Sequence, residues 1–355
     1  MTLLCTPLRA AAGEPRLEAK QRGSSAPFAW NLRTLLRRNW PIAVGLLMLP
    51  TTAVTAQELE GKDQVNVGIA KSASPQLRKS AETEKLLKVD PHRKFEFADH
   101  VANGIAMRNR TAGTIHLRGA PVPSKVLAAL LYFNFSDGSR DGPRNIPVLF
   151  NGNRIVANKT ADHDDPCWGM AGNHSYVADV TQLVPIGGHL NQDYQVVIQF
   201  DAETTTTGEN PWPLDPNQKV RVEGASLIVV YRTQDTTGPV FLYDALNNSM
   251  FAVTAQFDLQ HPSLAGDGRL TMVGADGQRG IGHTNIGNEL TFFNGSQIAG
   301  PPVASSDWDG SDGWPLPQLW DTHTHNVTLN GSISSVRYQG SLDCLVPVAF
   351  VIDAD

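Results

Sequence analysis

Cysteine, charge and long apolar runs are all scarce in this chain. Three cysteines in 355 residues exclude a small disulfide-rich scaffold. Charged residues make up 18% and the net charge is -6, with no basic block outside residues 31–57, which excludes nucleic acid as the main partner. No later apolar run approaches the roughly 20 residues of a membrane helix. The sequence therefore predicts no transmembrane anchor after the leader.

The segment Asn31–Gln57 has the features of an export signal. Basic residues, including Arg37 and Arg38, precede the apolar run Pro41–Leu49, which is too short to span a bilayer. Small residues then suit cleavage after Ala56. We expect a signal region over residues 1–56 and a secreted or extracytoplasmic protein. The paired arginines leave a twin-arginine route open beside the general one.

Only Cys167 and Cys344 lie beyond the predicted cleavage. Two cysteines in an oxidising compartment predict a disulfide. The chain-entropy model gives such a long loop on the order of 4 kcal/mol. Two buried free thiols are the alternative.

The composition divides the exported part in two. Residues 57–93 are rich in Lys, Glu, Ser and Gln with few large apolar residues, so we expect a polar disordered tether. Residues 94–355 carry short β-branched and aromatic runs between Gly, Pro and Asn clusters. Their roughly 260 residues suit one large β domain, or two packed sub-domains with a boundary near residue 235.

The strand pattern predicts an all-β fold. The nearly continuous apolar runs Val126–Phe135 and Ala225–Tyr231 are typical of central strands. Asn151-Gly152 and Asn294-Gly295 each follow an apolar run and predict type I′ hairpins. Because no helical periodicity separates the strands, they must pair antiparallel. We expect a large two-sheet sandwich of jelly-roll type.

Several strand motifs carry a family resemblance. They are Lys125–Asn134, Val148–Gly152, Tyr176–Thr181 and Glu223–Arg232, followed by Phe241–Asp244, Gly274–Gly277 and Asn288–Gly295. In this order the chain resembles an uncharacterised family of exported β-sandwich domains on bacterial and archaeal surface proteins, over residues 115–295. The resemblance implies an extracellular or surface module with no assigned catalytic residues.

Asp321, His323 and His325 form the sharpest local motif. Residues two apart in a strand share a face, so the three side chains are candidate ligands of a transition metal. A cupin-like site built on His323 and His325 would need a third ligand from another strand, such as His283 or Glu289. The alternative is a solvated strand face with satisfied histidines.

Asp307, Asp309 and Asp312 alternate along a glycine-containing loop. This oxygen-rich spacing suits calcium, although an EF-hand would need glycine where Asp312 stands. An ordinary acidic turn is the alternative. Calcium is the cofactor that the sequence suggests.

Tryptophans fall in the same loop. Trp308 and Trp314 stand next to Asp and Gly residues, and exposed indoles in such surroundings build sugar-binding surfaces. Each ring could equally pack its loop onto the sandwich.

Together these features predict a secreted, non-enzymatic β-sandwich with a structural or ligand-binding role and a cell-surface or extracellular partner, such as a glycan or a protein. No nucleophile motif such as Gly-x-Ser-x-Gly is present. The alternative function is an extracellular hydrolase that uses Asp321, His323 and His325 as metal ligands, or a pair of carboxylates.

Overall fold

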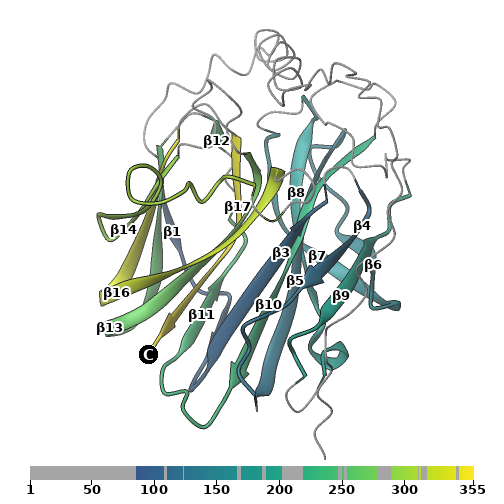
Figure 1. The fold of residues 1–355 in the computed structure, drawn as a ribbon. Helices are drawn as coiled ribbons and strands as arrows, with labels where there is room; N and C mark the ends of the chain where they lie inside the picture. The colour runs from purple at the N-terminus through teal and green to yellow at the C-terminus, as the bar shows by residue number, and fades with distance from the viewer. Residues whose placement is uncertain are drawn as a thin grey trace, which may run out of the picture. The chain divides into compact units, whose positions relative to one another are not determined.

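Two β-sheets account for nearly all regular structure in the computed structural model, which describes residues 85–107, 110–122, 124–165, 169–185, 189–201, 219–246, 250–251, 254–278, 289–310, 312, 318–340 and 344–355. Within these residues, the helical structure is a single 3-10 turn, η2 (Thr181–Leu183). No helix in the described part is long and apolar enough to cross a membrane. The all-β, antiparallel two-sheet prediction is confirmed (Figure 1).

The eight-stranded sheet is built from one continuous part of the chain. Its strands are β3 (Asp99–Ala106), β4 (Ala112–His116), β5 (Lys125–Asp137), β6 (Asn145–Phe150), β7 (Asn153–His163), β8 (Gly172–Asp179), β9 (Asp193–Ile198) and β10 (Val220–Arg232). They are ordered β3-β10-β5-β8-β7-β6-β9-β4. Because β4, at one end, also contacts β3 and β10 at the other, the sheet curls into a near-barrel.

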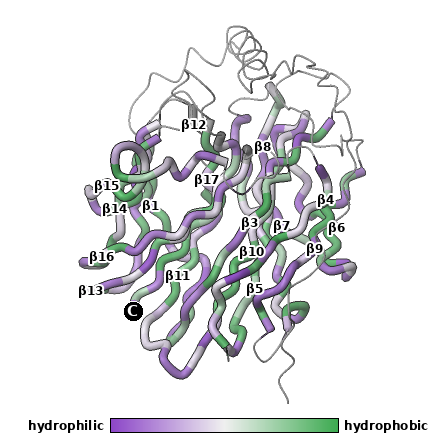
Figure 2. The backbone as a smooth tube through the Cα atoms, viewed as in Figure 1, coloured by the Kyte–Doolittle hydropathy of each residue, from purple (hydrophilic) through white to green (hydrophobic). Residues whose placement is uncertain are grey.

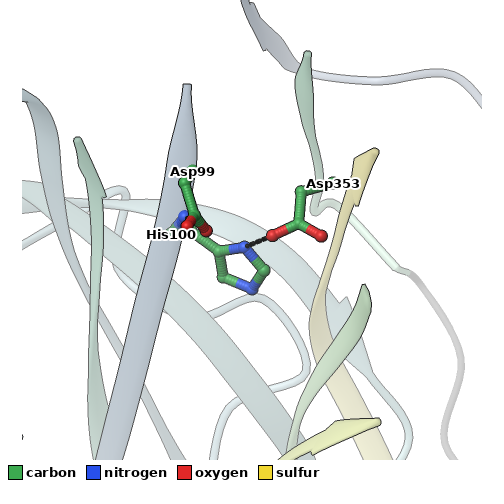
Figure 3. A group of neighbouring side chains, drawn as sticks. All are labelled: Asp99, His100 and Asp353. Carbon is green, nitrogen blue, oxygen red and sulfur yellow. Dashed lines mark hydrogen bonds and ion pairs between the residues drawn. The ribbon is translucent and has the colours of Figure 1, made fainter. Parts of the chain in front are cut away.

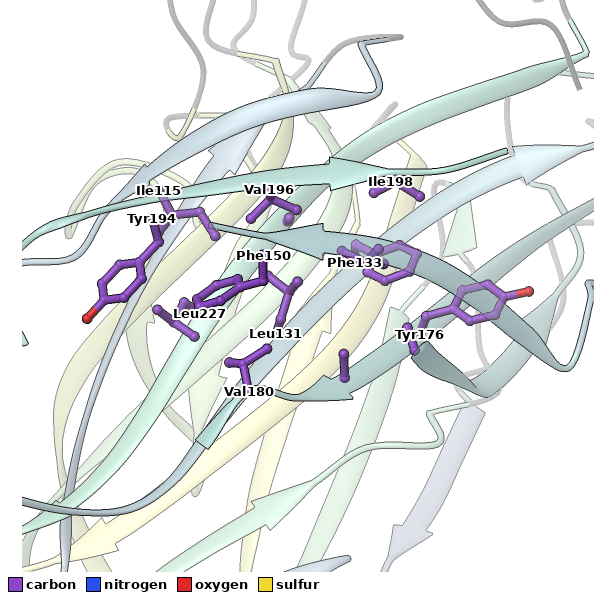
Figure 4. Close-up of a cluster of buried hydrophobic side chains, with 14 of the residues drawn as sticks. Ile115, Leu131, Phe133, Phe150, Tyr176, Val180, Tyr194, Val196, Ile198 and Leu227 are labelled. Atoms are coloured by element: carbon purple, nitrogen blue, oxygen red, sulfur yellow. The ribbon is translucent and has the colours of Figure 1, made fainter. Parts of the chain in front are cut away.

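The inside of this near-barrel is a closed apolar core. Side chains from strands across the sheet, among them Ile115, Leu131, Phe150, Val196 and Leu227, are fully buried there (Figure 4). Strands β5 and β10 pair along most of their length and are buried on both faces. This explains their nearly continuous apolar sequences, which Figure 2 shows for β10.

The nine-stranded sheet takes strands from both sides of that segment. Its strands are β1 (Lys85–Val89), β2 (Arg93–Phe95), β11 (Val240–Tyr243), β12 (Met250–Phe251), β13 (Thr254–Gln278), β14 (Leu290–Phe293), β15 (Ser296–Ala299), β16 (Gln318–Gln339) and β17 (Cys344–Ala354). The main order is β15-β14-β16-β13-β17-β11-β2, with β1 on β13 and β12 on β17. All pairs are antiparallel except β1 with β13.

Two cores hold this sheet in place. Leu130, Ile228 and Val230 of the eight-stranded sheet meet Val273 and Val351 of the nine-stranded sheet in the core between the sheets. The opposite face of the nine-stranded sheet carries a separate aromatic core that includes Phe257, Trp308, Tyr338 and Phe350.

The local predictions meet different outcomes. Both hairpins are confirmed, since Asn151, Gly152, Asn294 and Gly295 all have positive φ at the β6–β7 and β14–β15 turns. Residues 85–93, placed in the tether by composition, instead contain β1 and begin β2. The rest of that segment and the signal region lie outside the described residues.

Candidate functional site

Strand β16 presents two chemically different faces. Its even-numbered residues Trp320, Thr322 and Thr324 form their side-chain hydrogen bonds on the side of the core between the sheets. The Trp320 indole N–H donates to Ser226 Oγ of β10 at 2.7 Å. The odd-numbered residues Asp321, His323 and His325 share the other face, as strand alternation requires. There they meet the loop between β15 and β16.

That loop brings three aspartates to the two histidines. We call Asp307, Asp309, Asp312, Asp321, His323 and His325 the carboxylate–histidine cluster. His323 Nε2 lies 3.4 Å from Asp321 Oδ1 and 3.9 Å from Asp309 Oδ1. One potential ligand atom from each of Asp309, Asp321 and His323 lies within 4.8 Å of the others. The structure thus joins one residue of the predicted calcium set to two of the predicted transition-metal set.

The remaining members are placed beside this group rather than in it. His325 Nε2 lies 2.7 Å from Asp307 Oδ1. The Asp312 carbonyl accepts a hydrogen bond from the Ala106 N–H of β3 at 3.0 Å, which fixes the loop to the other sheet. Among the described residues, neither group with ligand atoms within 4.8 Å of one another includes Asp307, Asp312 or His325, and the two ligand sets suggested by the sequence stay predictions.

A buried indole seats the loop on the sheet. Trp308 is fully buried and makes an edge-to-face contact with Tyr338, their ring centroids 5.1 Å apart. A Cβ at Gly274 would collide with the Trp308 ring, and one at Gly277 with the Asp321 carboxylate. Glycines on β13 thus make room for the site. Trp308 packs its loop and is not an exposed sugar-binding surface, whereas Trp314 lies outside the described residues.

The electrostatics of the cluster follow from burial. The side chains of Asp307, Asp309 and Asp321 are 2%, 9% and 0% exposed, against 24% for His323. Burial alone would lower the pKa of His323, but the hydrogen bond to Asp321 and the surrounding carboxylates raise this pKa to about 9. Burial raises the pKa of Asp312 to about 7, helped by the charges of Asp321 and Asp309.

Of the two further ligands considered from the sequence, His283 lies outside the described residues. Glu289 is buried and accepts a hydrogen bond from Ser306 Oγ at 3.2 Å, so it is placed beside the loop. Cys167 also lies outside the described part, and its pairing with Cys344 stays a prediction.

A second polar group lies between the sheets and was not predicted. We call Asp99, His100, Arg269 and Asp353 the inter-sheet cluster, of which Figure 3 shows Asp99, His100 and Asp353. His100 of β3 places Nδ1 2.8 Å from Asp353 Oδ2 of β17 and Nε2 2.6 Å from Thr271 Oγ1 of β13. Arg269 forms ion pairs with both aspartates. These groups are far apart in sequence, so no local motif announces them.

A cavity of about 580 Å³ opens on the nine-stranded sheet. Phe293, Ile298 and Val327 are the apolar residues that line it. The polar residues that line it lie on β13, β16 and the β14–β15 hairpin and at Asp355: Asp267, Asn294, Ser296, Asn326 and Thr328. We call it the hairpin pocket. Apolar residues together with a few polar ones are the usual lining of a small-molecule site.

The sequence was compared with protein families and with curated proteins. Neither a family model nor a curated protein matches the chain.

Proposed function

We propose that this chain is an exported, non-enzymatic β-sandwich module that binds a saccharide in the hairpin pocket. The observation that carries the proposal is the pocket itself, about 580 Å³ in volume and lined by both apolar and polar residues. The proposal agrees with the resemblance to exported surface domains.

The residues that line the pocket favour a saccharide. Phe293, Ile298 and Val327 offer apolar groups that suit the C–H face of a sugar ring. Asn294 and Ser296 of the tight β14–β15 hairpin also line the pocket, and their carboxamide and hydroxyl groups can donate to and accept from sugar hydroxyls.

The test is a screen of neutral oligosaccharides on an array, followed by calorimetry on any hit. Ile298→Trp should weaken binding at least tenfold, because the larger ring would fill space that the pocket offers to a sugar. Ile333→Trp is the matched control, because Ile333 is an exposed isoleucine on β16 outside the pocket. No saccharide binding, or equal binding by both variants, would remove the pocket from the proposal.

Export and the disulfide are part of the same proposal. Cleavage after Ala56 would give a mature protein that begins at Gln57, which mass spectrometry of the secreted protein would detect. A Cys167–Cys344 bridge would release two hydrogens on oxidation, which lowers the mass by about two units, and would remove two thiols from titration. A retained leader would contradict the export step alone.

A metal-dependent hydrolase is the second candidate. One observation favours it, because potential ligand atoms of Asp309, Asp321 and His323 lie within 4.8 Å of one another. Against it, the two carboxylates are at most 9% exposed, which leaves a substrate little access. Hydrolysis of ester, glycoside or phosphoester probes that His323→Gln abolishes would make this candidate the leading one.

A further inference from the structure

We infer that Asp309, Asp321 and His323 bind one divalent transition-metal ion, which fastens the β15–β16 loop to strand β16. The inference is independent of the hairpin pocket and of any saccharide. It replaces the two separate ion sites suggested by the sequence with one composite site.

The distances are those of a site that needs only small side-chain adjustments. Two ligand atoms that bind the same zinc ion at 2.0–2.2 Å in tetrahedral geometry lie roughly 3.4 Å apart. His323 Nε2 and Asp321 Oδ1 are 3.4 Å apart. Asp309 Oδ1 lies 3.9 Å from the same nitrogen, so rotation of its carboxylate toward His323 completes three protein ligands.

A second observation points to a missing polar partner at the same place. Asp307 has one oxygen bonded to His325, while its Oδ2 is buried with no hydrogen-bond partner within the described part of the chain. The Asp307 carboxylate stands close enough to His323 for its charge to raise the pKa of that histidine. A water molecule bound to the ion would supply the donor that Asp307 Oδ2 lacks.

The ligand types decide the class of ion. Calcium and magnesium prefer sites made of oxygen atoms, as manganese largely does, whereas imidazole nitrogen suits zinc, copper, iron and nickel. One imidazole with two carboxylates therefore favours a first-row transition metal over calcium. Trp308 and Gly277 hold the loop backbone against Asp321, so the ligands from loop and strand are already adjacent before the ion binds.

The inter-sheet cluster shows why proximity alone is not enough. Asp99, His100 and Asp353 also have ligand atoms within 4.8 Å of one another. There the Arg269 guanidinium already forms ion pairs with both carboxylates. A metal ion would have to displace this fixed cation, so we assign no ion to that cluster.

The test uses the whole chain purified without chelator, with zinc and manganese as probes. Elemental analysis and calorimetry should find one equivalent of metal per chain. Asp309→Asn should weaken zinc binding by at least about 100-fold, since even outer-shell partners of metal ligands typically contribute 10–100-fold. This variant neutralises one carboxylate of a crowded group, so it should fold, and the melting temperature of its metal-free form would confirm that.

Three histidine variants separate this site from others. His325→Gln should keep most of the zinc affinity, whereas His323→Gln should lose it, although both histidines lie on the same face of β16. His116→Gln, at an exposed histidine paired with Asp193, should bind like the wild type. Absorption of bound cobalt should lack a thiolate charge-transfer band, which excludes binding at cysteine. Failure to bind zinc or manganese, binding of calcium alone, or zinc affinity unchanged by Asp309→Asn and His323→Gln would overturn the inference.

Discussion

The carboxylate–histidine cluster and the inter-sheet cluster are built from the same residue types but balance their charge differently. In the inter-sheet cluster the cation is Arg269, whose guanidinium stays charged at every relevant pH. In the other, the described partners of the carboxylates are imidazoles, His323 and His325. An imidazole can lose its proton and bind a metal ion instead, whereas a guanidinium keeps its proton and cannot bind one.

The difference teaches how to distinguish a structural ion-pair network from a ligand site in a β-sandwich. The inter-sheet cluster joins β3 to β13 and β17 and is complete without any added ion. The carboxylate–histidine cluster joins a loop to one strand, and an additional ion would strengthen that attachment. We expect the first to determine global stability and the second to respond to solution conditions.

Replacing Asp353 by alanine should have the largest effect. It removes the side-chain partner of His100 Nδ1 and the more buried of the two carboxylates that pair with Arg269, and breaking a buried ion pair costs about 3–5 kcal/mol. Urea unfolding would measure the loss, with Asp235→Ala as the exposed control. A change no larger than that of the control would show that the inter-sheet cluster does not hold the sheets together.

Removal of metal should affect only the other cluster. Zinc at 100 times its dissociation constant should raise the free energy of unfolding by about 2.7 kcal/mol, and chelation should reverse this. Asp353→Ala should show the same gain as the wild type, because its cluster does not contribute ligands. Unequal gains would mean that the two clusters are coupled.

Gly274→Ala should disturb the loop without touching a charged group. The new methyl group meets the Trp308 ring, and overpacking of this kind costs about 1–3 kcal/mol. Gly138→Ala is the control, because a Cβ there meets no atom within 4 Å. Thermal unfolding would compare them, and a neutral Gly274→Ala would show that Trp308 can move away without loss.

The smallest effect should come from replacing His174, a histidine that belongs to neither of the two clusters. His174 lies 3.1 Å from Asp137 and 2.7 Å from Asp162. Burial lowers its pKa, but these two carboxylates raise it above 6.5 overall. The pKa values of Asp137 and Asp162 lie below 3.8, because hydrogen bonds outweigh the rise caused by burial.

The pH dependence follows from these directions. The two aspartates contribute to the free energy of unfolding above pH 3.8, and this contribution disappears as pH falls through their lowered pKa values. His174 contributes below pH 6.5, and its contribution disappears as pH rises through its raised pKa. The stability difference between wild type and His174→Gln should therefore be largest between these limits. A difference that grows above pH 7 would contradict this assignment.

The fold was predictable because its signals are local. Strand alternation and the Asn-Gly turns identify hairpins such as β14–β15 from a few adjacent residues. The length of β13 was not predictable, because Pro262 and Gly266 resemble breaks while the strand continues through a register shift. Strand β1 was missed because its lysines indicate a solvated segment, whereas Leu87 packs on the aromatic core.

The candidate site was predictable only within one strand. Alternation correctly placed Asp321, His323 and His325 on one face. The path of the loop, which Trp308 packing determines, decides that Asp309 lies beside His323 and Asp307 beside His325. The sequence alone does not show that path. The inter-sheet cluster depends on contacts such as His100 with Asp353, which are 253 residues apart.

The division of the chain between the sheets has a consequence for the order of folding. Residues 99–232 contain every strand of the eight-stranded sheet, so its pairing can finish before the rest of the chain is available. Strands β1 and β2 come earlier in the chain but must wait for β13 and β11, and such distant pairing is intrinsically slow. During synthesis, β1 and β2 would therefore be among the last strands to join a sheet.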